Sequence, residues 1–138
     1  MSRRTLFAVL VPLIALAGCG GSSGATDHTK VIGRWTRNMT VADWGSYGSS
    51  FPTGPWTMDI KKSGAVDVYT PGSNEVPDFT TRFSDQSGGR FVIGSVPICN
   101  TSGTYRWKRS GSHLTIKVIT DKSCGPRAAL WSGTWTKK

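Results

Sequence analysis

Apolar and polar residues alternate along most of the chain after residue 30, and glycine, proline and short polar runs interrupt the alternation. A period of two residues is typical of strands with one buried and one solvated face. No segment shows the 3.6-residue period of an amphipathic helix, so we expect an all-β domain. The pattern predicts eight strands, at residues 31–37, 55–61, 65–70, 78–84, 90–95, 103–109, 112–120 and 127–137.

The turn at residues 62–64 predicts a hairpin between the second and third strands. Its sequence, Lys-Ser-Gly, suits a three-residue loop in which Gly64 takes the left-handed conformation. Antiparallel pairing around this loop places apolar side chains opposite one another, which a half-buried sheet requires. The expected pairs are Ile60 with Val66 and Met58 with Val68.

A second hairpin is predicted for residues 103–109 and 112–120, closed by the dipeptide Ser110-Gly111. One face of this hairpin is apolar and the other carries basic residues and His113, so we expect His113 to face outward. The expected pairs are Arg109 with Ser112, Trp107 with Leu114, Tyr105 with Ile116 and Gly103 with Val118.

Eight short strands with short connections are most simply arranged as an antiparallel up-and-down meander. Closing it into a β-barrel removes both exposed edges, and a two-sheet sandwich is the alternative. Eight strands enclose either a core filled by side chains or one small ligand, and the sequence leaves both open. The expected inward residues are Trp35, Trp56, Met58, Ile60, Val66, Val68, Phe79, Phe83, Phe91, Ile93, Tyr105, Trp107, Leu114, Ile116 and Val118.

The segment 38–54, between the first two strands, is too apolar for a simple linker. Long ordered loops of this kind often carry function. We expect it to cover one end of the barrel or to form part of its rim. Its apolar residues are Met39, Val41, Trp44, Tyr47 and Phe51.

The first nineteen residues have the pattern of a bacterial export signal. Arg3 and Arg4 precede an apolar stretch, 6–17, that is too short to span a bilayer but suits a secretory signal. The tetrapeptide Leu-Ala-Gly-Cys that ends at Cys19 resembles the lipobox of bacterial lipoproteins. This resemblance implies cleavage before Cys19 and diacylglycerol on its sulfur, and two acyl chains make a stable anchor. The expected segments are 1–18, a lipoprotein signal peptide; 19–30, the lipidated cysteine and a flexible linker; and 31–138, the barrel domain.

This start predicts a lipid-anchored protein on the extracytoplasmic face of the cell membrane, in a bacterial cell envelope. Outside the cytoplasm, cysteines tend to form disulfides. Because Cys19 would carry lipid, we expect Cys99 and Cys124 to pair.

The charge of the chain is strongly positive, with 17 Lys and Arg residues against 8 Asp and Glu residues and a formal net charge of +9. These basic residues are scattered, which is typical of a solvated outer face that favours anionic surfaces. Basic residues interleaved with aromatic ones also occur in nucleic-acid-binding proteins. An exported, tethered chain rarely meets nucleic acid, so we expect no nucleic-acid partner.

Three segments are similar to lipocalins, which belong to the calycin group, and in particular to bacterial lipocalin-like lipoproteins. They are Gly-Arg-Trp at 33–35, Gly-Thr-Tyr-Arg-Trp at 103–107, and 121–127 together with 131–135. The resemblance implies a lipocalin-like, eight-stranded up-and-down β-barrel. It also implies that Trp35 closes the floor of the barrel, with Arg127 as its partner.

The resemblance further implies that the barrel binds a small hydrophobic ligand. The alternative is a filled barrel that acts as a protein-interaction or inhibitor module in the envelope. The expected partners are a small apolar ligand or an envelope protein, with the membrane reached through the lipid anchor; we expect a monomer with no cofactor or metal. The candidate ligand-binding residues are Trp35, Trp44, Trp56, Met58, Phe83, Tyr105 and Trp107.

Enzymatic activity is not predicted. His28 falls in the linker, and no Ser or Cys sits in a recognised nucleophile turn. The nearest approach to catalytic chemistry is a possible carboxylate pair, Asp59 and Asp67, across the second and third strands.

Overall fold

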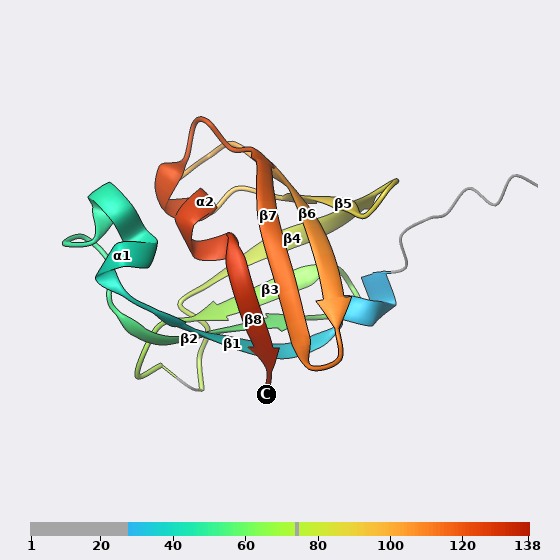
Figure 1. The fold of residues 1–138 in the computed structure, drawn as a ribbon, viewed down its shortest axis with the longest axis horizontal. Coiled ribbons are helices and arrows are strands. Elements are labelled where there is room, and N and C mark those ends of the chain that lie inside the picture. Colours follow the sequence, from blue (N-terminus) through green and yellow to red (C-terminus); the bar gives the residue numbers. More distant parts are fainter. Residues whose placement is uncertain (1–27, 74) are drawn as a thin grey trace, which may run out of the picture.

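The computed structural model describes residues 28–73 and 75–138. Within them, eight strands are each antiparallel to the next, and the last pairs with the first, so the sheet is a closed barrel (Figure 1). The predicted up-and-down barrel is therefore confirmed, and the two-sheet alternative is excluded. Cys19, the predicted signal peptide and most of the predicted linker lie outside the described residues. The strands are β1 (Gly33–Met39), β2 (Gly54–Ile60), β3 (Ala65–Tyr69), β4 (Phe79–Gln86), β5 (Arg90–Ile93), β6 (Gly103–Ser110), β7 (His113–Thr120) and β8 (Gly133–Lys137).

The two ends of the barrel differ in how the strands are connected. At one end, called here the closed end, short turns join β2 to β3, β4 to β5 and β6 to β7. The 3₁₀ helix η1 (His28–Val31) and the C-terminus lie there too. At the other, called here the open end, the longer connections 40–53, 70–78, 94–102 and 121–132 join the remaining strands. These carry α1 (Val41–Trp44), the 3₁₀ helix η2 (Gly45–Tyr47) and α2 (Gly125–Trp131), and both α-helices lie on the same side in Figure 1.

The hairpin of β2 and β3 has the predicted register. Ile60 lies opposite Val66, and Met58 lies opposite Val68. Gly64 closes the turn with a φ of +81°, which a glycine adopts without the strain that a Cβ atom would cause.

The register predicted for the hairpin of β6 and β7 is wrong by two positions. Trp107 lies opposite Ile116 and Arg109 opposite Leu114. The turn lies at Gly111 and Ser112, so Gly111 occupies its first position, with a φ of +58°, and not its second position as predicted. A shift of two residues keeps every side chain on its face, so the alternation of apolar and polar positions does not distinguish the two registers.

The first half of the predicted last strand is also wrong, because residues 125–131 form α2. Pro126 stands in the first turn of this helix, where its missing N–H costs nothing. Arg127, Leu130 and Trp131 are buried, and their spacing of three and four residues places them on one face of the helix. The strand begins only at Gly133.

Aromatic and aliphatic side chains fill the barrel between its ends. Phe91 stacks on Phe83 and on Tyr105, with ring centroids 4.4 and 5.5 Å apart. Most of the predicted inward residues are buried, but Phe79 and Trp107 are only half-buried, and Val118 is 44% exposed. Val118 lies opposite Tyr105 of β6, but β8 pairs with β7 only as far as Ile116, so β7 has no strand on its β8 side at Val118.

Trp35 is fully buried near the closed end, where its indole Nε1 donates a hydrogen bond of 2.7 Å to the carbonyl of Val31. The cations beside its ring are Arg109 and Lys137, at 5.6 and 5.7 Å from the ring. The predicted pairing of Trp35 with Arg127 is therefore wrong. Arg127 belongs to α2, which lies at the open end of the barrel.

Candidate functional site

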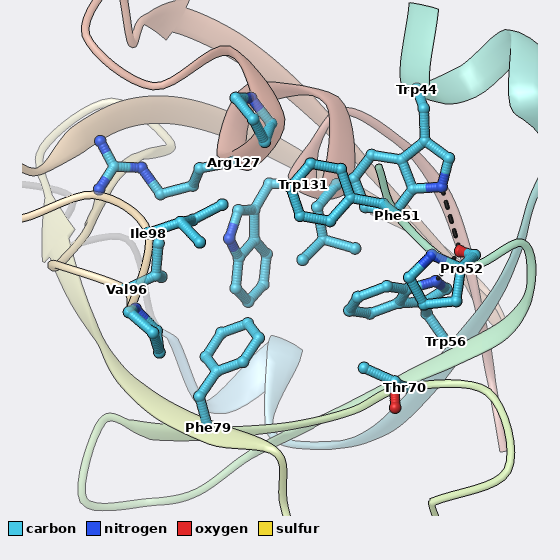
Figure 2. A pocket seen from close by; sticks show the side chains of 13 residues that line it. Trp44, Phe51, Pro52, Trp56, Thr70, Phe79, Val96, Ile98, Arg127 and Trp131 are labelled. Carbon is cyan, nitrogen blue, oxygen red and sulfur yellow. Dashed lines mark hydrogen bonds between the residues drawn. The ribbon is translucent and has the colours of Figure 1, made fainter. Parts of the chain in front are cut away.

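An apolar pocket of about 210 Å³ lies at the open end of the barrel (Figure 2). Each of the longer connections contributes to its wall, and β2 and β4 supply the strand residues nearest that end. The lining residues are Trp44, Phe51, Pro52, Trp56, Thr70, Phe79, Val96, Pro97, Ile98, Pro126, Arg127, Leu130 and Trp131.

Aromatic rings form the side of the pocket nearest α1. Trp44 stacks on Phe51 at a centroid distance of 4.8 Å and meets Trp56 edge to face at 5.3 Å. The indole Nε1 groups of Trp44 and Trp56 both donate to the carbonyl of Pro52, at 3.2 and 2.9 Å. One backbone oxygen therefore holds both rings, and their carbon faces are left to line the pocket.

A capping box fixes the short helix that carries Trp44. The Thr40 side chain accepts a hydrogen bond from the backbone N–H of Asp43, and the Asp43 carboxylate accepts one from the backbone N–H of Thr40 at 2.8 Å. The Thr40 hydroxyl also donates to this carboxylate at 2.6 Å. These hydrogen bonds, with a smaller contribution from Arg37, lower the pKa of the Asp43 carboxyl.

Arg37 of β1 connects α1 to α2. Its Nη2 lies 2.7 Å from the Asp43 carboxylate. Its Nη1 donates to the carbonyls of Ala129 and Leu130, at 3.2 and 3.1 Å, and to that of Ser132. A cation at the last carbonyls of a helix offsets the negative end of the helix dipole. The two helices that border the pocket are therefore held by one side chain.

A buried ion pair supports the wall formed by α2. Arg127 binds the Asp121 carboxylate in two places, through Nε at 2.7 Å and Nη2 at 2.6 Å, and neither side chain is exposed. The Tyr105 hydroxyl donates to the same carboxylate. Burial raises the pKa of Tyr105, and the hydrogen bond to Asp121 raises it further. The hydrogen bond to Asp121 also raises the pKa of Arg127.

Arg127 also reaches the connection between β5 and β6. Its Nη1 donates to the carbonyl of Gly94 at 3.2 Å and to that of Thr101. The charge of the guanidinium is thus matched by Asp121 and directed at backbone oxygens. In Figure 2 the guanidinium points away from the other lining side chains, so the pocket meets the carbon stem of Arg127.

The predicted disulfide between Cys99 and Cys124 is present, with a Cα–Cα distance of 5.9 Å. It ties the connection that carries Val96, Pro97 and Ile98 to the residue that precedes α2. The two walls on this side of the pocket are therefore joined covalently as well as through Arg127.

Two of the seven predicted ligand-binding residues, Trp44 and Trp56, line the pocket. The other five lie elsewhere. Trp35 is near the closed end, Met58, Phe83 and Tyr105 are within the filled core, and Trp107 packs against that core half-buried.

Sequence reasoning missed most of the pocket because its lining residues lie in connections, where no alternation marks the inward positions. A partial signal is a proline directly beside a large apolar residue in a connection. Pro52 follows Phe51, and Pro97 lies between Val96 and Ile98.

The carboxylate pair exists, but the two side chains share a lysine as their counterion. Asp59 lies opposite Asp67, and Lys61 Nζ is 2.7 Å from the first carboxylate and 3.6 Å from the second. The Thr80 hydroxyl donates to Asp67 at 2.7 Å. His28 lies 2.8 Å from Asp85, and His113 is exposed as predicted. Residues 28–73 and 75–138 bring no three His, Cys, Asp or Glu side chains together in a way that could hold a metal ion.

No helix in the described part of the chain is long and apolar enough to cross a membrane. Comparison with known proteins gives no match to a protein-family model, a curated protein or a solved structure.

Proposed function

We propose that this chain is an extracytoplasmic lipoprotein, anchored in a bacterial membrane through lipid on Cys19, whose barrel binds a small apolar molecule. The observation that carries the binding part of this proposal is the carbon-lined pocket at the open end, bounded by Trp44, Trp56 and Trp131. Ligand sites are typically concave and mostly apolar, and they occur in the mouths of β-barrels.

The size of the pocket limits its ligand. Drug-sized molecules occupy pockets of roughly 300–1,000 Å³, whereas an apolar cavity of about 150 Å³ is enough to bind benzene. A volume of about 210 Å³ therefore suits one ring with a small substituent, or a short aliphatic chain. The stacked core of Phe83, Phe91 and Tyr105 closes the barrel behind it.

Binding can be tested by ¹⁹F NMR with fluorobenzene as the probe and the purified full chain. We expect the probe signal to broaden and shift in a saturable way. Thr70→Trp adds a ring at the pocket and should abolish the effect, whereas Thr136→Trp, on the exposed face of β8 at the closed end, should leave it intact. Unsaturable broadening, or equal responses from both variants, would contradict a specific pocket.

The anchor is tested separately, because Cys19 lies outside the described residues. Cells fed radiolabelled palmitate should label the wild-type chain but not Cys19→Ser. If both chains label equally or neither does, the proposed anchor is wrong, whatever the pocket binds.

A second candidate function, docking of an envelope protein, has one observation in its favour. Val41, Val76 and Ile98 are 61, 71 and 57% exposed, and all three lie on connections at the open end. In-cell photo-crosslinking from position 76, with position 136 as the control, should yield a discrete adduct only from position 76. An adduct that persists when Thr70→Trp has filled the pocket would favour docking over ligand binding.

A further inference from the structure

The tryptophans that line the pocket differ in whether their indole N–H groups have a hydrogen-bond acceptor. Trp44 and Trp56 donate to the carbonyl of Pro52. The Nε1 of Trp131 is buried and has no hydrogen-bond partner among residues 28–73 and 75–138. Trp131 itself is only 1% exposed, so bulk water does not supply the missing acceptor. Buried polar groups in folded proteins are usually paired, which makes this donor an exception that requires an explanation.

The position of the donor associates it with the pocket. Trp131 lies among the lining side chains, and its Nε1 edge faces the side formed by Val96 and Ile98 (Figure 2). The side chains of both neighbours are hydrocarbon and offer no acceptor. The Ile98 side chain is largely exposed at the rim, so it can move aside at little cost in buried surface while Val96 and the backbone stay in place.

The other polar groups of the wall are already engaged. Arg127 is bound to Asp121 and to backbone carbonyls. A hydrogen bond from the Thr70 side chain helps to lower the pKa of Asp78, and Thr70 turns its oxygen away from the pocket in Figure 2. Among the described lining residues, Trp131 therefore supplies the side-chain donor that remains for a ligand.

We propose that the ligand is a neutral apolar molecule with one hydrogen-bond acceptor, such as a ketone, ester or ether oxygen, which accepts from Trp131 Nε1. This inference rests on the proposed function, since it names the chemistry of the molecule bound in the same pocket. An indole N–H is a donor only, so the ligand must provide the acceptor. A carboxylate is disfavoured, because the nearest cation is already paired with Asp121 and an unpaired charge is costly to bury.

Two probes of nearly equal shape isolate the hydrogen bond. Acetophenone carries a carbonyl oxygen where α-methylstyrene carries a CH₂ group, and benzoate adds a charge. Dissociation constants would be measured for the full chain, for Trp131→Phe, and for Trp56→Phe as the matched control that loses an N–H already bonded to Pro52. We expect the affinity ratio of ketone to hydrocarbon to fall about fivefold in Trp131→Phe and to stay constant in Trp56→Phe. We also expect benzoate to bind more weakly than acetophenone.

A measurement on the wild type removes the dependence on variants. In the ¹H–¹⁵N spectrum of the tryptophan-labelled chain, acetophenone should move the Trp131 indole N–H signal downfield, and α-methylstyrene should not. If both probes bind but the ratio and the indole signal do not respond, the hydrogen bond is disproved and the apolar pocket stands. If neither probe binds, the proposed function fails and this inference fails with it.

Discussion

The two ends of the barrel are built by different means. At the closed end, short turns join neighbouring strands, and the contacts that define them are local in the sequence. At the open end, the structure depends on links between distant residues: Arg37 reaches α2 across 92 to 95 positions, and Arg127 reaches residues 94 and 101 across 33 and 26. Local patterning is therefore sufficient to form the turns of the closed end, although the floor also uses the pairing of β1 with β8. A pocket of defined shape additionally requires specific polar and covalent links between long connections.

The largest expected effect is at the open end, in the buried ion pair. Asp121→Asn leaves the Arg127 charge buried without its counterion, and we expect a loss of about 3–5 kcal/mol in the free energy of unfolding. Urea unfolding measures this loss. Asp59→Asn, at a partly exposed pair with Lys61, should cost less than about 1 kcal/mol.

A double variant sharpens this result. Asp121→Leu combined with Arg127→Met removes both charges and should recover much of the lost stability. If the double variant is as unstable as Asp121→Asn, the effect comes from packing and not from an uncompensated charge.

The disulfide should have the next largest effect. Replacing Cys99 and Cys124 by Ala opens a loop with a sequence separation of 25, and the chain-entropy estimate for such a loop is about 3 kcal/mol. Because the disulfide joins two walls of the pocket, we also expect weaker binding of fluorobenzene. The measurement is thermal unfolding with and without dithiothreitol. If the reductant does not change the unfolding temperature of the wild-type chain, the predicted stabilisation by the disulfide is wrong.

At the closed end, the expected effects are smaller and confined to the turns. Gly64→Ala forces a Cβ into the left-handed region and within 2.8 Å of the Phe83 carbonyl oxygen, so we expect a loss of about 1–2 kcal/mol. Gly111→Ala is the matched control, because its φ is +58° but its Cβ would meet nothing within 4 Å. It should lose less stability than Gly64→Ala, and neither variant should alter binding at the open end.

The smallest expected effect is a decrease of stability at acidic pH. Hydrogen bonds from Thr40 lower the pKa of Asp43, and those from Thr70 lower the pKa of Asp78, each from an ordinary value of 3.8. A carboxyl whose pKa is lowered by folding stabilises the fold above its unfolded pKa and loses that contribution as pH falls through the folded value. The free energy of unfolding should therefore decrease as the pH is lowered below about 4. The double variant Asp43→Asn with Asp78→Asn should show a weaker dependence of the free energy of unfolding on pH in this range. An unchanged dependence would mean that other groups cause it.

The same division explains what the sequence alone could predict. At the closed end, alternation and a glycine turn were enough to pair Ile60 with Val66 and to bury Trp35. At the open end, Leu130, Trp131 and Trp135 read as one strand, because a seven-residue helix followed directly by a short strand leaves too few residues to show its own period. The cysteine pair was predictable because few cysteines are available, whereas the partner of Arg127 depends on how the chain folds back on itself.

The register of β6 and β7 shows a limit of a different kind. Both candidate turns contain Gly111, and both keep Trp107 and Tyr105 on the inner face. Only the conformation at the turn separates them, and a periodic pattern carries no information about it.

The placement of the C-terminus has a practical consequence for experiments. Lys138 lies at the closed end, where its backbone N–H is bonded to the carbonyl of Arg34, and His28, the first described residue, lies at the same end. An affinity handle fused after Lys138 would therefore hold the molecule on a biosensor surface with the aromatic mouth turned toward the flowing analyte. Immobilisation in that orientation would give every captured copy the same solvent access.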